Sequence, residues 1–487
     1  MSSYFILSLI ASYFGLLILI SYLTTKNSDQ NTFYNGNKQA PWYLVAYGMI
    51  GASLSGITFI SIPGVVGNVD GLNGQFSYMQ VVLGYLLGYF VIAQVLLPLY
   101  YKLNLTSIYT FLEQRFGQYS YKTGAFFFLL SRTIGAAFRL FLVATVLQLA
   151  VFQSWGVPFE ITVVITILLI WIYTFKGGIK TIIYTDTLQT TFMLLSVILT
   201  VYYIAQEFNW GATELVSAID QGGMSKWFFW DWKSPNNFFK QFFSGAFIAI
   251  VMTGLDQDMM QKNLACKNLG EAKKNVFTFS IILFFVNLLF LTLGALLYLY
   301  AANKGIEIPS KTDQLFPMLA LNNFTPLIGG LFILGIIAAA YSSADSALTA
   351  LTTSFCIDFL GFEKKGTNIK TRTYVHIGFS VLLLLVIILF NRINNDSVIS
   401  ELFKVAGYTY GPLLGLFAFG MITKRPVRDR LVPIICILSP TICYFINKFS
   451  VELLNGYKFG FEILILNGFL TFVGLYILSV GKVRNKQ

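Results

Sequence analysis

Long apolar stretches alternate with short polar ones along almost the whole chain. Strings such as "YFILSLIASYFGLLILISYL" and "SVLLLLVIILF" are continuously apolar, whereas the strands of a membrane β-barrel alternate. A helix of about 20 apolar residues crosses the ~30 Å hydrocarbon core of a bilayer. The pattern therefore predicts an all-α polytopic membrane protein that is embedded in a lipid bilayer.

The pattern predicts thirteen transmembrane spans. They lie near residues 4–24, 44–64, 77–101, 122–151, 157–175, 182–206, 237–257, 274–301, 325–358, 372–391, 399–421, 430–447 and 460–480. If the N-terminus is outside and the C-terminus cytoplasmic, 22 of the 33 Lys and Arg residues fall on the inner side and 8 on the outer side. This asymmetry obeys the positive-inside rule. We therefore expect one transmembrane domain, residues 1–487, in the plasma (inner) membrane.

The composition and the absence of certain sequence motifs argue against several classes of function. The chain is 56% hydrophobic and 11% charged, against about 25% charged in soluble domains. The net charge of +11 fits basic membrane loops, so we expect no nucleic-acid partner, and no obligate protein partner is evident. Neither a phosphate-binding loop nor a hydrolase-like nucleophile and base is found, which argues against ATP drive and against an enzyme. The four cysteines and the one histidine form no zinc-binding motif, and we interpret the cysteines as small apolar packing residues. These residues are Cys266, Cys356, Cys436, Cys443 and His376.

The span at 44–64 contains the stretch "YGMIGASLSGITFISIPGVVG", which is rich in glycine and carries hydroxyls at Ser53, Ser55 and Thr58. Its glycines and Pro63 weaken a membrane helix. Freed backbone groups are tolerated at that depth only where they line a cavity or are buried in protein. The stretch therefore predicts a broken helix at a binding site, and close helix packing through small residues is the alternative.

The stretch "AAAYSSADSALTA" places a carboxylate and several hydroxyls inside another apolar span. On a helix, Ala339, Ser342 and Ser343 fall on one face. One carbonyl and two hydroxyl oxygens directed to one point are hard ligands that suit Na⁺. If the glycine-rich span unwinds near Gly51 and Leu54, their carbonyls would complete a five-oxygen site. The alternative is that the hydroxyls bond back to their own helix.

Several charged residues lie inside or at the ends of spans. Asp186 lies within a span and is a candidate functional residue by default. Asp256 and Asp258 lie near the end of a span and are interpreted as interfacial. Arg132 and Arg139 are seven residues apart, on one face of their helix. Each must pair with protein groups or meet an anionic ligand, and the sequence does not decide between these two roles.

Five stretches carry a resemblance to a known family. They are "GASLSGITFISIPG" (51–64), "YTDTLQT" (184–190), "LDQDMMQKNLACKN" (255–268), "AAAYSSADS" (338–346) and "GYTYGPLLGLFAFGMITKR" (407–425). Through them the chain resembles the sodium:solute symporter family over nearly its whole length. The resemblance implies a 5+5 inverted-repeat fold of the LeuT type. The extra helix would be 4–24, repeat one about 44–206, repeat two about 237–421, and two further helices about 430–480.

The resemblance also implies Na⁺ as the coupling ion. Its main site would use the carbonyls of Gly51, Leu54 and Ala339 with the hydroxyls of Ser342 and Ser343, in agreement with the helix-face argument. Some members hold a second cation, and the matching positions here are Asp186, Ser342, Ser343 and Ser346. Asp345 stands where some two-sodium members have a hydroxyl, so it could join the second site or bind elsewhere, and the number of Na⁺ ions stays open.

Solute contacts are implied in the same way. The candidates are Ser53, Ser55, Thr58, Phe76, Gln80, Met252 and Lys404. The sialic acid carriers use an Arg on the helix where Arg132 and Arg139 bracket the matching position. Three cationic side chains within spans favour an anionic solute, such as sialic acid or another carboxylate, imported with Na⁺. A neutral sugar or polyol is the alternative solute. A proton-coupled carrier, a channel and a sensor built on the same fold are less favoured functions.

Overall fold

The computed structural model describes residues 3–25, 38–68, 71–105, 107–174, 178–362, 368–393 and 398–479. This part of the chain is helical and has two isolated bridges but no extended strand. The α-helices are α1 (Ser3–Thr25), α3 (Trp42–Ser53), α4 (Gly56–Val65), α5 (Tyr78–Val91), α6 (Leu97–Leu103), α7 (Thr110–Arg115), α8 (Gln118–Leu147), α9 (Phe159–Thr174), α10 (Gly178–Glu207), α11 (Ala212–Gln221), α12 (Phe238–Ala249), α13 (Gln257–Leu264), α14 (Leu269–Asn303), α15 (Leu315–Asn322), α16 (Pro326–Ser354), α18 (Ile369–Ile393), α19 (Val398–Thr409), α20 (Gly411–Ile422), α21 (Val432–Lys448), α22 (Ser450–Leu453) and α23 (Ile463–Leu478). Short π- and 3-10-helical turns extend or join them; they are η2 (Ile92–Leu96), η3 (Gln148–Phe152), η4 (Gln153–Trp155), η5 (Ile250–Gly254), η6 (Thr312–Gln314), η7 (Phe355–Phe359) and η8 (Asp429–Leu431).

The predicted all-α membrane class is confirmed. Among the described residues, 8 helices are long and apolar enough to cross a membrane, or up to 11 spans if each of three bent helix pairs counts as one. Two shorter apolar helices, α9 and α23, would both be needed to reach thirteen spans. The count of thirteen therefore stays a prediction.

The first bent pair is the broken helix that the glycine-rich stretch predicts. α3 and α4 meet at 55°. Leu54 leaves the helical conformation, with φ −86° and ψ 71°, and Ser55 is extended. Gly51 lies in the last turn of α3, where carbonyls lack intrahelical partners. The break thus frees backbone oxygens in the interior of the molecule.

The second bent pair corrects the interpretation of Asp256 and Asp258 as interfacial. The apolar span does not end there but turns by 67° and continues as α13. Both aspartates are fully buried, with 0% and 1% of their surface exposed. The Asp256 carboxylate caps α13 by accepting hydrogen bonds from the N–H groups of Asp258 (3.0 Å) and Met259 (3.3 Å). A buried helix start needs such a cap, because its N–H groups have no other partners.

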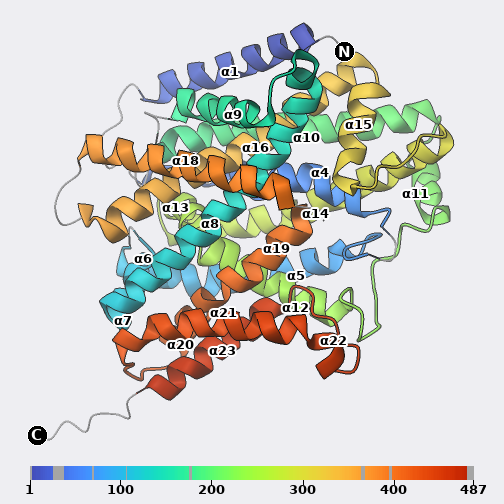
Figure 1. Cartoon of the computed structure of the whole chain (residues 1–487). Coiled ribbons are helices and arrows are strands. Elements are labelled where there is room, and N and C mark those ends of the chain that lie inside the picture. Colours follow the sequence, from blue (N-terminus) through green and yellow to red (C-terminus); the bar gives the residue numbers. More distant parts are fainter. Residues whose placement is uncertain are drawn as a thin grey trace, which may run out of the picture.

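Close helix packing joins α5 to α12, the first half of the second bent pair. A Cβ atom on Gly84 of α5 would lie 2.0 Å from the Phe242 carbonyl oxygen of α12, and one on Gly245 would lie 2.1 Å from that of Val81. The two backbones therefore touch directly, as glycine allows in membrane helices. In Figure 1, α1 lies on one side of the molecule and α20, α21 and α23 on the other, with α4, α14 and α16 between them.

Candidate functional site

A buried ion pair joins α10, α13 and α16. Lys262 Nζ donates to Asp186 Oδ2 at 2.7 Å, and Ser342 Oγ donates to Asp186 Oδ1 at 2.6 Å. None of the three residues exposes more than 1% of its surface. Removing one partner from a buried ion pair leaves an uncompensated charge and is strongly destabilising. Asp186 and Lys262 therefore hold each other in place.

The break between α3 and α4 lies beside this ion pair. The Gly51 N–H donates to Thr190 Oγ1 at 3.1 Å, and Thr190 is one turn beyond Asp186 on α10. A Cβ atom on Gly56 would lie 3.3 Å from the Ala340 Cβ of α16. The freed carbonyls of the break are thus held against the turn of α16 that carries the predicted Na⁺ ligands.

The two serine hydroxyls at this turn make different hydrogen bonds. Ser342 donates to Asp186, whereas Ser343 donates to the carbonyl of Ala340 at 3.0 Å. Both hydroxyl oxygens keep lone pairs for a cation. Together with the nearby carbonyls they form an oxygen-rich, buried arrangement that fits a small hard cation such as Na⁺. The exact set, Gly51, Leu54, Ala339, Ser342 and Ser343, stays a prediction.

The residues predicted for a second cation are Asp186 on α10 and a group on the same turns of α16, namely Ser342, Ser343, Asp345 and Ser346. The Asp345 carboxylate is fully buried and accepts a hydrogen bond from the N–H of Ser346 at 2.5 Å. The hydroxyl of Ser346 is buried and has no hydrogen-bond partner within the described ranges. Asp186, the central residue of that prediction, is already bound to Lys262.

A cavity of about 70 Å³ lies beside the first break, between α3, α4, α5, α8, α12, α14 and α19. Six of the residues predicted to bind solute line it, and they are Ser53, Ser55, Thr58, Arg132, Arg139 and Met252. The rest of the wall is mainly aromatic and aliphatic, with Tyr78, Tyr85, Tyr89, Ile248, Leu402 and Phe403 among its residues. The cavity thus combines an apolar wall with a few hydroxyls and two guanidinium groups.

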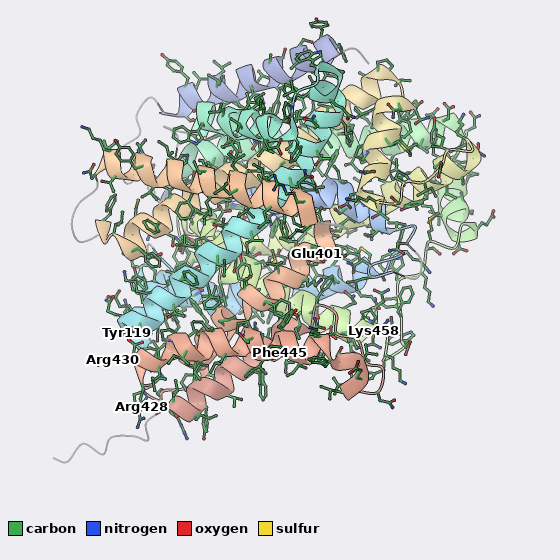
Figure 2. All side chains as sticks on the ribbon, in the orientation of Figure 1. Tyr119, Glu401, Arg428, Arg430, Phe445 and Lys458 are labelled. Atoms are coloured by element: carbon green, nitrogen blue, oxygen red, sulfur yellow. The ribbon has the colours of Figure 1, made fainter. Side chains whose placement is uncertain are left out.

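Three of the predicted solute contacts lie away from this cavity lining. Gln80 donates to the Asn236 carbonyl at 2.9 Å and thereby fastens the segment that precedes α12. The ring of Phe76 packs on the same segment. Lys404 forms an ion pair with Glu401 at 3.1 Å and is more than half exposed. Figure 2 labels Glu401 on α19. In this conformation Phe76, Gln80 and Lys404 therefore do not line the cavity.

The two arginines differ in their partners. Arg132 forms a hydrogen-bonded ion pair with Asp258, and one oxygen of Asp256 lies 3.9 Å from its guanidinium. Its charge is therefore balanced inside the protein. Arg139 is also buried, at 6% exposed, but its Nε and Nη1 have no hydrogen-bond partner among the described residues. A buried cation without such partners at a cavity wall is costly unless it meets an anion.

Sequence reasoning missed Lys262 and the tyrosines of the cavity wall. Lys262 lies four residues after Asp258 on α13, beyond the position where the span was predicted to end. A charged residue with this helical spacing from a second charge was the available signal. The tyrosines carried no such signal, because aromatic residues are common throughout an apolar helix.

The family model and the curated relatives agree on one family. The model of the sodium:solute symporter family matches residues 33–429. The chain is 27% identical to the sodium/sialic acid symporter NanT of Aliivibrio fischeri, over 85% of this chain and 82% of that protein. It is 26% identical to the sodium-coupled monocarboxylate transporter 1 of Xenopus laevis, over 88% and 69% respectively. Its fold matches a Na⁺-coupled sialic acid symporter solved in a substrate-bound outward-open state, with a TM-score of 0.81, 21% identity and 97% coverage of both chains.

Proposed function

The chain belongs to the sodium:solute symporter family, and from this premise we propose that it takes up a small organic carboxylate together with Na⁺. It is a Na⁺-coupled secondary active carrier with the LeuT-type fold and not an enzyme. The proposal concerns the solute and the residues that bind it.

One observation supports a carboxylate above all: of the two arginines at the cavity wall, one forms a hydrogen-bonded ion pair and the other has two guanidinium nitrogens without hydrogen-bond partners among the described residues. Arg132 is neutralised by Asp258, whereas two guanidinium nitrogens of Arg139 lack partners at the cavity wall. A planar guanidinium binds a carboxylate through two parallel hydrogen bonds. Ser53, Ser55 and Thr58 line the same cavity, and their hydroxyls can bind the other polar groups of the solute. The sialic acid and monocarboxylate carriers among the relatives both transport carboxylates by name.

The size of the cavity bears on how the solute enters. Its volume of about 70 Å³ is well below the ~300–1,000 Å³ of typical small-molecule sites. A sugar acid would therefore bind only when the walls move apart. Such movement is what alternating access around a midplane site requires.

The ion site and the orientation are part of the same proposal. Na⁺ binds between the carbonyls of the α3–α4 break and the serine hydroxyls of α16. The N-terminus is outside and the C-terminus cytoplasmic, as the distribution of basic residues favours. The two inverted repeats cover about 44–206 and 237–421. The first repeat then begins with the broken helix α3–α4, and the second begins with the broken helix α12–α13.

The test is a binding experiment on purified protein. Thermal stability is measured with sialic acid, short monocarboxylates, neutral sugars and polyols, with and without Na⁺. A carboxylate should stabilise the wild type in Na⁺. Arg139→Lys should weaken its binding by roughly 10- to 150-fold, because one charged hydrogen bond is worth about 1.5–3 kcal/mol. Stabilisation by Na⁺ alone should stay near the wild-type value.

Arg132→Lys is the matched comparison on the same helix. It perturbs the ion pair with Asp258, so it should lower stability in every condition without a selective loss of carboxylate binding. If only neutral sugars or polyols bind, the solute is not a carboxylate and the proposal is abandoned. It also fails if Arg139→Lys binds the carboxylate as tightly as the wild type.

A further inference from the structure

We propose that Asn287 of α14 accepts a hydrogen bond from a hydroxyl group of the solute, so that the transported compound is a hydroxylated carboxylate, such as a hydroxy acid or a sugar acid. This contact rests on the carboxylate symport proposed above and deepens it, because it adds a second polar contact to the one at Arg139. The solute contacts predicted from the sequence include no residue of α14. Asn287 adds this helix to the binding site.

The amide of Asn287 is only half satisfied within the protein. Asn287 is 1% exposed and lines the cavity together with Leu283, one turn earlier on α14. Its Nδ2 donates to the Leu283 carbonyl at 2.8 Å, whereas its Oδ1 has no hydrogen-bond partner in the part of the chain that the structure describes. The carbonyl fixes the orientation of the amide, because the reverse orientation would place two acceptor oxygens against each other. The free group of Asn287 is therefore an acceptor.

Packing against both halves of the first broken helix holds Asn287 at the cavity wall. Earlier on α14, Asn275 Nδ2 lies 3.4 Å from the Met49 Sδ of α3. Two turns beyond Asn287, a Cβ atom on Gly294 would lie 2.6 Å from the Pro63 carbonyl oxygen of α4. Asn287 lies between these two contacts, on a helix that is anchored on both sides of the break. A polar group on such a helix is held more precisely than one on a loop.

The buried polar atoms without partners in the cavity wall require opposite chemistry from a ligand. Among the described lining residues, Asn287 Oδ1 is the one such oxygen, and the nitrogens in the same condition belong to Arg132 and Arg139. The hydroxyls of Tyr78 and Tyr85 differ, because they are hydrogen-bonded to each other at 2.8 Å. Guanidinium N–H groups require an acceptor, whereas an amide oxygen requires a donor. A carboxylate only accepts, so the donor must come from another group of the solute, and a hydroxyl supplies it.

Water is the other candidate partner of the Asn287 oxygen. The cavity of about 70 Å³ has room for a few water molecules, at about 10–15 Å³ for each. A water bound there before the solute arrives has to leave when the solute binds. Displacing an ordered water by a group that cannot reproduce its hydrogen bond loses affinity. A solute without a hydroxyl leaves the oxygen unpaired, and a site of this kind rejects it.

The experiment compares acids that differ by hydroxyl groups alone. Titration calorimetry on the purified full chain in Na⁺ measures the binding of lactate against propionate and of gluconate against hexanoate, and sialic acid is titrated as a further hydroxylated acid. The wild type should prefer hydroxylated acids. Asn287→Leu keeps the branched shape of the side chain and removes the acceptor. It should weaken the binding of hydroxylated acids by roughly 3- to 10-fold, the worth of one neutral hydrogen bond, and leave the binding of propionate and hexanoate near the wild-type value.

Asn275→Leu is the matched control on the same helix. Asn275 is also buried, and its Nδ2 donates to Asn263 at 2.7 Å, but it does not line the cavity. Its replacement should lower stability and leave the preference for hydroxylated acids unchanged. A wild type that binds propionate and hexanoate as tightly as their hydroxylated partners would overturn the role of Asn287, and this result does not depend on whether a variant folds.

Wild-type affinity of Asn287→Leu for the hydroxylated acids would overturn this role as well, and would assign the free oxygen to water. Both of these outcomes leave carboxylate symport with Na⁺ intact. Failure of every acid to bind, sialic acid included, would instead refute the carboxylate function itself.

Discussion

At the scale of single residues, Ser342 has two roles. Its hydroxyl donates its hydrogen to Asp186, and its oxygen is one of the five predicted Na⁺ ligands. A hydroxyl that donates a hydrogen bond to a carboxylate is a better cation ligand. The hydrogen bond polarises the O–H bond and leaves more electron density on the hydroxyl oxygen. Ser342 is therefore the point at which the ion pair and the predicted Na⁺ site meet.

Replacing both Ser342 and Ser343 by alanine removes two of the five predicted oxygens. The sodium concentration for half-maximal uptake should rise at least several-fold, and transport assays in liposomes over a range of Na⁺ concentrations measure it. Thr352→Val is the control on the same helix. Its hydroxyl donates to the Leu348 carbonyl at 2.7 Å and contacts His376, so its loss should leave the sodium dependence unchanged. Wild-type sodium dependence in the double variant would mean that the site is misassigned.

The candidate site was predictable from the sequence only where a residue stands out against its neighbours. Asp186 and the serines of α16 are polar groups in apolar runs, and their positions alone mark them. The choice between Arg132 and Arg139 could not be made that way. Arg132 finds Asp258 126 residues further along the chain, and nothing in the local sequence encodes that contact.

At the scale of helices, the same contrast separates the two central breaks. The glycines on either side of it, Gly51 and Gly56, mark the break between α3 and α4, whereas Pro63 lies within α4. The turn between α12 and α13 carries no proline, and its signal is the capping residue Asp256, which resembles an ordinary charged residue at a membrane boundary. The sequence therefore places the first break correctly and ends the second span too early, at 257 instead of Leu264.

Helix contacts through glycine can be tested by adding one methyl group. In Gly84→Ala the new Cβ would clash with the Phe242 carbonyl at 2.0 Å. The change should lower the free energy of unfolding by about 1–3 kcal/mol, as overpacking of a tight contact does. Thermal melting of the purified protein measures the effect. Gly378→Ala on α18 is the control, because nothing lies within 4 Å of its added Cβ. Equal melting temperatures for the two variants would contradict the close contact of α5 and α12.

At the scale of the whole molecule, the small cavity and the ion site are two parts of one transport cycle. The ring of Tyr78 on α5 stacks on Phe403 of α19, with centroids 6.4 Å apart and planes 7° apart. Both rings line the cavity. The α3–α4 break contributes to the cavity and also lies beside the Na⁺ ligands. A movement that opens the cavity for solute therefore also changes the surroundings of the ion.

This shared element predicts a reciprocal linkage between Na⁺ and solute. If saturating Na⁺ raises the affinity for the carboxylate by some factor, the carboxylate must raise the affinity for Na⁺ by the same factor. Titration calorimetry of each ligand, with and without the other, measures both factors, and K⁺ in place of Na⁺ is the control. Arg139→Lys should weaken solute binding while leaving Na⁺ binding without solute unchanged. Solute affinity that is the same in Na⁺ and K⁺ would contradict coupling through the broken helix, because a ligand that binds two states equally shifts neither.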